Sequence, residues 1–148
     1  MDITNLIRED VVTVYLDETL LDVAAVLEEK RVGSAVVLDA HDKPLGVVTD
    51  RDFVVYGRRF ADALDRTTVN EILSLGVVSV TSDVSVTELT AQMKDEHVRR
   101  IPIIEDGELR GIVTLDDVIV HLAEELDNDE LRNLAAVIKA ESPSLEER

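Results

Sequence analysis

The chain contains one sequence unit twice, and this duplication constrains the fold more than any other feature. The string GVVTDRD, from Gly46 to Asp52, returns 65 residues later as GIVTLDD, from Gly111 to Asp117. Upstream, Asp17 matches Asp83 at a spacing of 66 residues. A spacing that holds over such a length indicates a duplicated unit. Because 148 residues is the size of one ordinary domain, we expect two small halves that share a core.

Each copy is expected to fold in the order strand, helix, strand, strand, helix. Short β-branched runs predict the strands, and Ser or Thr followed three residues later by Asp or Glu predicts most helix starts. In the first copy the expected ranges are a strand at 11–15, a helix at 19–31 with Gly33 as its exit, strands at 34–38 and 45–48, and a helix from 49. In the second copy they are a strand at 77–81, a helix at 85–97, strands at 101–104 and 109–113, and a helix at 114–125.

Two further helices are expected outside the copies. Thr68 and Glu71 have the spacing of a capping box and predict a short helix between the copies. After Asn128, apolar residues recur at helical spacing and predict an amphipathic C-terminal helix. These residues are Leu131, Leu134, Ala135 and Ile138.

Charge and composition exclude several classes of function. With 32 acidic and 15 basic residues the net charge is −17, and such a field repels nucleic acids and anionic membranes. The acid-rich, lysine-poor composition favours adaptation to high intracellular salt. The absence of cysteine removes thiolate metal sites and thiol nucleophiles. Neither a leader segment nor a membrane span is recognisable, so we expect a soluble cytoplasmic protein.

No catalytic or metal-binding constellation is evident in the sequence. His41, His97 and His121 have no metal-ligand spacing. No glycine precedes a lysine, which excludes a phosphate-binding P-loop. No nucleophile is paired with a base. We therefore expect neither a catalytic residue nor a metal site, and not an enzyme.

The candidate binding residues are the threonine and the aspartate of each repeated string. Thr49 and Thr114 stand where a strand gives way to a helix, and unpaired N–H groups at such a point favour a phosphate. Asp52 and Asp117, one turn later, are suited to accept hydrogen bonds from ribose hydroxyls. The same spacing is also that of an ordinary capping box. A glycine three residues before each threonine favours the binding interpretation, because it lets a ligand approach the backbone.

These features resemble the paired cystathionine β-synthase (CBS) domain, or Bateman module, over roughly Leu6 to Leu126. The resemblance rests on the order of elements, the two glycine-led Thr-x-x-Asp strings, and the run RRIPI from Arg99 to Ile103. It implies an α+β fold of two tandem β-α-β-β-α repeats related by a pseudo-twofold axis, with an added C-terminal helix. The implied domains are repeat 1 at 6–60, a connecting segment at 61–73, repeat 2 at 74–126, and a C-terminal helix and tail at 127–148.

The resemblance also implies a regulatory module that binds an adenosine-containing ligand in clefts between the repeats. It assigns Asp52 and Asp117 to the ribose and places the adenine against the backbone that enters the second strand of each copy. The residues of this second group are Gly33, Ser34 and Ala35 after Val32 in the first copy, and Val98, Arg99, Arg100, Ile101 and Pro102 in the second. The residues expected to line the clefts from before each first strand are Ile7, Arg8, Leu73 and Ser74. A disc-shaped homodimer is implied as well.

The source of positive charge for a phosphate stays open at this stage. Arg99 and Arg100 are either phosphate ligands or solvated partners of Asp95 and Glu96. The first copy has no such arginine pair. The residues that would have to supply the charge there are Arg51, Arg58 and Arg59.

The ligand and the function also keep alternatives. AMP, ADP, ATP and S-adenosylmethionine share the adenosine part that the named residues would contact. The rival function is a ligand-free interaction module that holds a partner enzyme or transporter through its acidic surface and C-terminal helix. Replacing Asp52 and Asp117 separates the two functions, because a sensor would lose its ligand and a scaffold only some helix-cap stability.

Overall fold

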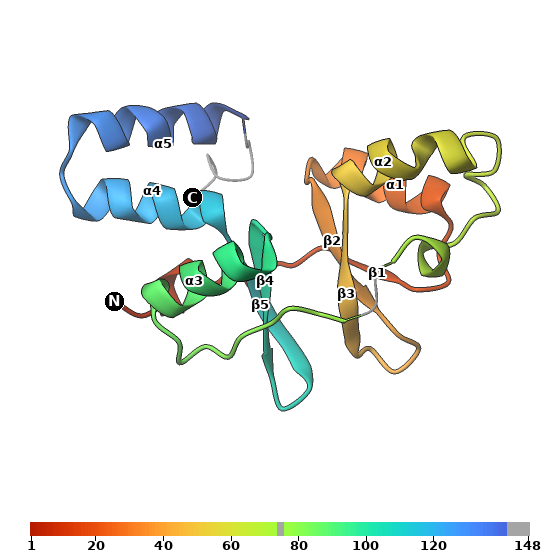
Figure 1. The fold of residues 1–148 in the computed structure, drawn as a ribbon, viewed down its shortest axis with the longest axis horizontal. Coiled ribbons are helices and arrows are strands. Elements are labelled where there is room, and N and C mark those ends of the chain that lie inside the picture. Colours follow the sequence, from red (N-terminus) through yellow and green to blue (C-terminus); the bar gives the residue numbers. More distant parts are fainter. Residues whose placement is uncertain (74–75, 142–148) are drawn as a thin grey trace. The chain divides into compact units, whose positions relative to one another are not determined.

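The computed structural model describes residues 1–73 and 76–141, which form two compact units. The first unit is Val11–Val77. The second unit combines Met1–Asp10 with the chain from Val78 onward. Figure 1 shows the elements of both units on the ribbon. Each unit has its own cluster of buried apolar residues, where the sequence predicted one core shared by the two halves.

The first unit is a three-stranded sheet with two main helices. Its strand β2 pairs in parallel with β1 and antiparallel with β3. The elements are β1 (Thr13–Tyr15), α1 (Leu20–Lys30), β2 (Ser34–Leu38), β3 (Pro44–Thr49), α2 (Asp50–Phe60) and the 3-10 helix η2 (Val69–Glu71). The apolar run of β2 occupies the centre of the sheet, and its last four residues are buried, as a run without polar alternation predicts.

The second unit repeats this plan with a smaller sheet and one more helix. Its strands β4 and β5 form an antiparallel pair. The elements are the 3-10 helix η1 (Thr4–Leu6), α3 (Val86–Glu96), β4 (Arg100–Glu105), β5 (Glu108–Thr114), α4 (Leu115–Glu125) and α5 (Asp129–Glu141). The α+β class, the order of helices and the C-terminal helix are confirmed.

The strand expected at 77–81 is wrong, because only an isolated parallel bridge between Val80 and Ile103 forms there. In the first unit the Val36 N–H donates to the Val12 carbonyl at 2.9 Å. Pro102 stands at the position that matches Val36, and proline has no N–H to donate. The second copy therefore loses one rung of the parallel ladder.

Gly33 does not end the first helix, as the sequence had suggested. The left-handed residue that terminates α1 is Arg31, with φ 54°, and its match in the second copy is His97, with φ 57°. Gly33 instead lies close to α2, where an added Cβ would be 3.1 Å from Oδ2 of Asp50. The absence of a side chain there serves packing between the chain entering β2 and the start of α2.

The segment that precedes each copy packs in the other unit. The Val86 N–H at the start of α3 donates to the Met1 carbonyl at 3.0 Å, and the Leu20 N–H at the start of α1 donates to the Thr67 carbonyl at 2.8 Å. Ile3 and Leu6 belong to the core of the second unit. Their matches, Val69 and Ile72, belong to the core of the first. The repeat limits expected from the sequence, which begin at 6 and 74, thus differ from the limits of the compact units.

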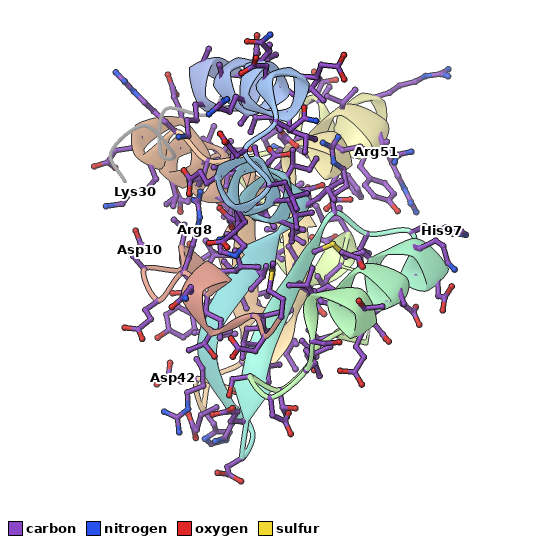
Figure 2. All side chains as sticks on the ribbon, turned by 90° about the vertical axis from the view of Figure 1, so that its left-hand side faces the viewer. Arg8, Asp10, Lys30, Asp42, Arg51 and His97 are labelled. Carbon is purple, nitrogen blue, oxygen red and sulfur yellow. The ribbon has the colours of Figure 1, made fainter. Side chains whose placement is uncertain are left out.

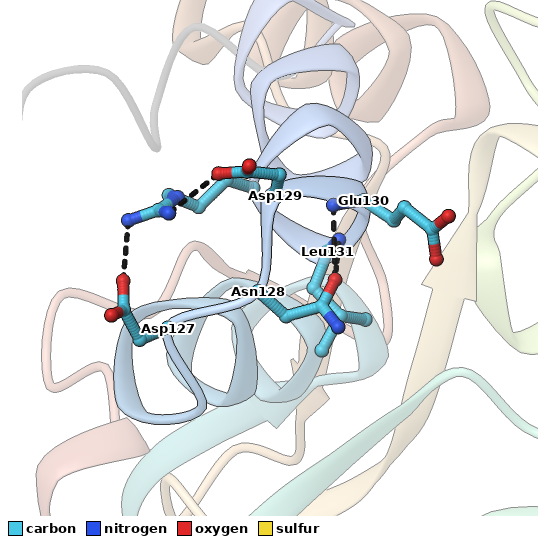
Figure 3. A network of polar contacts seen from close by, with 6 residues as sticks. Asp127, Asn128, Asp129, Glu130 and Leu131 are labelled. Carbon is cyan, nitrogen blue, oxygen red and sulfur yellow. Dashed lines mark hydrogen bonds and ion pairs between the residues drawn. The ribbon is translucent and has the colours of Figure 1, made fainter.

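The helix α5 continues the second unit beyond the duplicated part. Asn128 caps it, because its side-chain oxygen accepts from the N–H groups of Glu130 at 2.9 Å and Leu131 at 3.1 Å (Figure 3). Arg132 bridges the carboxylates of Asp127 and Asp129 at 2.7 and 2.6 Å. The α5 helix packs on α4. Among the described residues, no helix is long and apolar enough to cross a membrane.

Candidate functional site

The two repeated strings form the junctions β3 to α2 and β5 to α4, and both junctions are closed by a reciprocal capping box. At the first, Oγ1 of Thr49 accepts from the Asp52 N–H at 3.3 Å, and Oδ2 of Asp52 accepts from the Thr49 N–H at 2.7 Å. At the second, the corresponding distances between Thr114 and Asp117 are 3.1 and 3.2 Å. The capping role that the spacing allowed is therefore present in both copies.

The chain that enters the second strand of each copy lies directly beside the junction. The Asp50 N–H donates to the Gly33 carbonyl at 2.9 Å, and the Leu115 N–H donates to the Arg99 carbonyl at 2.8 Å. In the sheets, Ser34 is the register partner of Thr49 and Arg100 that of Thr114. The fold thus brings each group of predicted adenine contacts next to its threonine and aspartate.

Some members of these groups offer only backbone to a ligand. The side chains of Ala35 and Ile101 are 2% and 0% exposed and belong to the two cores. Pro102 is buried as well, and Val98 packs against the second core. The remaining accessible positions are Gly33, Ser34, Arg99 and Arg100, none of which is buried.

The expectation that α2 begins with free N–H groups is wrong. The N–H of Asp50 is taken by Gly33, that of Arg51 by the Asp50 carboxylate at 2.8 Å, and that of Asp52 by Thr49. The first turn also carries the carboxylates of Asp50 and Asp52. Because both the donors and the helix dipole are already answered by the chain, the start of α2 does not favour an anion.

The two conserved-position glycines of the strings make room for the chain itself. A Cβ on Gly111 would lie 2.5 Å from the carbonyl oxygen of Arg8 and 2.5 Å from Cγ2 of Ile7. A Cβ on Gly46 would lie 3.0 Å from Cδ1 of Leu73. Both glycines therefore admit the preceding segment that packs on the sheet, which removes the argument that they are present for a ligand. Ser74, the fourth predicted lining residue, lies outside the described residues.

The environments of the two aspartates differ. The Asp117 side chain is 1% exposed, and its Oδ1 accepts from Nε of Arg8 at 3.1 Å and lies 3.0 Å from Nη2. Figure 2 labels Arg8 on the N-terminal segment. Asp52 is half-buried. In the described ranges, 1–73 and 76–141, no side chain donates to it or forms an ion pair with it.

Arg8 is the site residue whose role the sequence did not reveal. It was expected to line a cleft, whereas the structure pairs it with a buried carboxylate. Its match under the duplication is Ser74, so the repeat comparison gives no signal for an ion pair. A lone arginine before the first strand would have been noticed only with the knowledge that this segment packs against the second copy.

The other arginines lie at the surface. Arg99 is 71% exposed on its side chain and approaches Asp116 at 3.5 Å, whereas Asp95 approaches Lys94. In the first unit Arg51, Arg58 and Arg59 are all exposed (Figure 2 labels Arg51). Exposed ion pairs of this kind contribute little to stability, so these groups remain available to an anionic ligand.

The carboxyl groups with shifted pKa lie away from both junctions. Hydrogen bonding from the backbone of Ser85 holds the pKa of Glu88 below its usual value. The Ser82 hydroxyl and N–H do the same for the pKa of Glu105. Both carboxylates serve local structure. Among the described residues, no group of three His, Cys, Asp or Glu side chains is placed to hold a metal ion.

Comparison with known proteins gives a consistent family. The family model described as "CBS domain" matches residues 2–58 and 69–124. The chain is 35% identical to an uncharacterized protein of Methanopyrus kandleri over 113 residues, which are 76% of this chain and 58% of that protein. It is 32% identical over 107 residues to hypoxic response protein 1 of Mycobacterium tuberculosis, covering 72% of this chain and 75% of the relative. The chain thus spans less than two thirds of the Methanopyrus protein.

Solved structures show the same fold. Hypoxic response protein I, solved with two coordinated zinc ions, has a TM-score of 0.72 at 29% identity and covers 82% of this chain and 99% of that one. The CBS domain pair of protein MJ0100, solved with 5′-methylthioadenosine and S-adenosyl-L-methionine, has a TM-score of 0.73 at 19% identity and covers 84% and 98%. At that identity the second likeness shows the fold alone.

Proposed function

The chain belongs to the CBS domain family, and from that premise we propose that it is a regulatory module that binds an adenosine-containing ligand without transforming it. The ligand class comprises AMP, ADP, ATP and S-adenosylmethionine. Supporting this class, one protein of the same fold was solved with 5′-methylthioadenosine and S-adenosyl-L-methionine. A ligand becomes a signal when it binds one arrangement of the module better than another.

The observation that carries the proposal is the state of Asp52. Its Oδ2 accepts from the Thr49 backbone, and among the described residues its Oδ1 has no donor, so that oxygen is open to a ribose hydroxyl. The Thr49 hydroxyl accepts from the Asp52 N–H and keeps its own hydrogen for a further acceptor. The neighbouring Gly33 and Ser34 present backbone beside this pair.

The charges near the first junction favour a ligand with few negative charges. Asp50 and Asp52 both lie in the first turn of α2, and two carboxylates repel a triphosphate. The arginines of α2 lie on its exposed surface and would have to turn toward a phosphate. We therefore place AMP and S-adenosylmethionine ahead of ATP without a metal.

The experiment is a thermal shift series with AMP, ADP, ATP with and without magnesium, S-adenosylmethionine, and GMP as the control. A ligand at about a hundred times its Kd adds about 2.7 kcal/mol, which raises the Tm of a chain of this size by roughly 5–10 °C. The shift should be confined to adenosine compounds and should vanish in Asp52→Ala. Melts in low and high potassium chloride also test the proposed salt adaptation, because screening should raise the Tm of so acidic a chain.

The matched control variant is Asp22→Ala. Asp22 stands third in the first turn of α1, after Thr19, whose hydroxyl accepts from its N–H at 3.2 Å. It has the same place in its helix as Asp52 in α2, in the same unit, without the neighbouring Gly33 and Ser34. If Asp22→Ala abolished the shift as well, the loss would reflect general destabilisation, and Asp52 would have no role in binding.

The second candidate is a ligand-free interaction module, and the reciprocal capping boxes favour it. Both Thr-x-x-Asp strings are fully explained by helix capping. Apolar side chains also stand exposed on two helices, with Val54 at 81% on α2 and Val137 at 61% on α5. If no adenosine compound shifts the Tm, this candidate takes precedence. A homodimer is part of both proposals, and sedimentation equilibrium tests it.

A further inference from the structure

We propose that Arg8 is a built-in occupant of the second junction, so that the chain binds one adenosine ligand, at Asp52, and none at Asp117. The inference rests on the proposed function, since it states which of the two candidate sites is open. It departs from the sequence, in which the two Thr-x-x-Asp strings are equivalent.

The contacts of Asp117 show what occupies it. Its Oδ2 accepts from the Thr114 N–H at 3.2 Å, and its Oδ1 accepts from Nε of Arg8 at 3.1 Å, with Nη2 at 3.0 Å. The lone pairs of Oδ1 that would accept from ribose hydroxyls are thus directed at the guanidinium. A charge-assisted contact from two guanidinium nitrogens is stronger than a hydrogen bond from a neutral hydroxyl, so a ribose would not displace it without compensation.

Burial prevents a ligand from approaching Asp117 by another route. The side chain of Asp117 is 1% exposed, and that of Arg8 is 15% exposed. The guanidinium therefore covers the carboxylate in addition to neutralising it. Asp52, by contrast, is half-buried and keeps an accessible edge.

The backbone fixes Arg8 in this position. Its N–H donates to the Ile112 carbonyl at 2.9 Å, and its carbonyl accepts from the Ile112 N–H at 3.0 Å, which forms an antiparallel bridge to β5. Beside this bridge, the absence of a side chain on Gly111 permits the close approach. Because the arginine is anchored on both sides, opening the second junction requires a rotation of its side chain out of a buried contact or the release of residues 1–8 from the sheet.

The first unit lacks the residue needed for the same closure. The position that matches Arg8 is Ser74, and a neutral serine cannot form a guanidinium pair with a carboxylate. The substitution of one charged residue between the two copies therefore decides which junction is open.

The experiment counts sites by isothermal titration calorimetry, with AMP and, separately, S-adenosylmethionine as probes. We expect one equivalent bound per chain in the unaltered protein, none in Asp52→Ala, two in Arg8→Gln, and one in Arg8→Gln/Asp52→Ala. The control Arg132→Gln removes the same unit of charge from an exposed ion pair of the second unit and should keep one equivalent. Circular dichroism checks that each variant is folded.

The outcomes separate the inference from the proposed function. If Asp52→Ala still binds one equivalent, or if folded Arg8→Gln still binds only one, the inference is overturned while an adenosine-binding module stands. If Arg8→Gln fails to fold, Asp52→Ala alone decides, because it leaves the Arg8 contact intact. If neither probe binds the unaltered protein or Arg8→Gln, the proposed function fails, and the inference fails with it.

Discussion

The first turn of α2 and the first turn of α4 have the same capping geometry but different surroundings. In α2, Asp52 closes a capping box and keeps an accessible side chain, whereas in α4 Asp117 closes the same box and is paired with Arg8. The duplication preserved the residues that start the helix, because a cap is needed wherever a helix follows a strand directly. The residue supplied by the preceding segment is not part of the cap and was free to change. Equivalent motifs in the two copies therefore do not imply equivalent sites.

The largest effect that separates the two junctions is expected from Arg8→Ala. It leaves the buried carboxylate of Asp117 without its partner, and breaking a buried ion pair on one side costs about 3 kcal/mol or more. Urea denaturation should show this loss. The exposed pair between Arg66 and Asp65, with side chains 68% and 67% exposed, provides the control. Arg66→Ala should change the free energy of unfolding by less than about 1 kcal/mol.

A double variant tests whether the lost stability comes from the buried charge. Arg8→Met/Asp117→Asn removes both charges, and the asparagine oxygen still accepts from the Thr114 N–H. We expect it to recover most of the stability lost in Arg8→Ala, because an uncharged pair carries no desolvation penalty. A double variant as unstable as Arg8→Ala would mean that the guanidinium contributes mainly by packing.

The next effect compares the two glycines of the repeated strings. Gly111→Ala forces a Cβ to within 2.5 Å of the Arg8 carbonyl, which is backbone held on β5, so the preceding segment has to shift. Gly46→Ala meets the flexible end of Leu73 at 3.0 Å, which rotation of that side chain relieves. We expect a loss of about 1–3 kcal/mol for Gly111→Ala and less than about 1 kcal/mol for Gly46→Ala. Equal losses in urea denaturation would contradict the difference between backbone and side-chain contacts.

The sequence predicted local structure well where one short pattern decides it. The capping residues and the apolar run of β2 fixed α1, β2 and α2 to within a residue or two, because propensity and caps act over a single turn or strand. The shortened ladder at Val80 was also foreseeable from Pro102, the match of Val36. The exchange of preceding segments was not, because the core that accepts Ile3 or Val69 is decided by tertiary packing. Without that exchange, Arg8 could not be assigned to Asp117.

A third, smaller effect concerns the helix that only the second unit possesses. Asn128→Ala removes the acceptor for the Glu130 and Leu131 N–H groups at the start of α5, which costs about 1 kcal/mol. Because α5 packs on α4, faster hydrogen exchange should be confined to these two helices. Elements of the first unit should keep their protection, and a uniform loss would show that α5 stabilises the whole chain.

The smallest effect compares the first helix of each copy and depends on pH. At α3, Ser85 and Glu88 form a reciprocal box, with the Ser85 N–H donating to the Glu88 carboxylate at 2.7 Å, and this bond lowers the pKa of Glu88 from its ordinary value of 4.5. A carboxyl group whose pKa is lower in the folded state stabilises the fold at pH values above its unfolded pKa, and this contribution is lost as the pH falls through the folded pKa.

Glu88→Gln should therefore lower the Tm slightly at pH 7 and cease to differ from the unaltered protein once the pH is well below 4.5. At α1 the matching residue is Asp22, and the printed bond is only the one in which Thr19 accepts from its N–H. Asp22→Asn should accordingly leave the Tm at pH 7 closer to that of the unaltered protein. If the Tm difference for Glu88→Gln persisted unchanged at acidic pH, the contribution of Glu88 would come from packing and not from its ionised carboxylate, and the two helix starts would differ in shape alone.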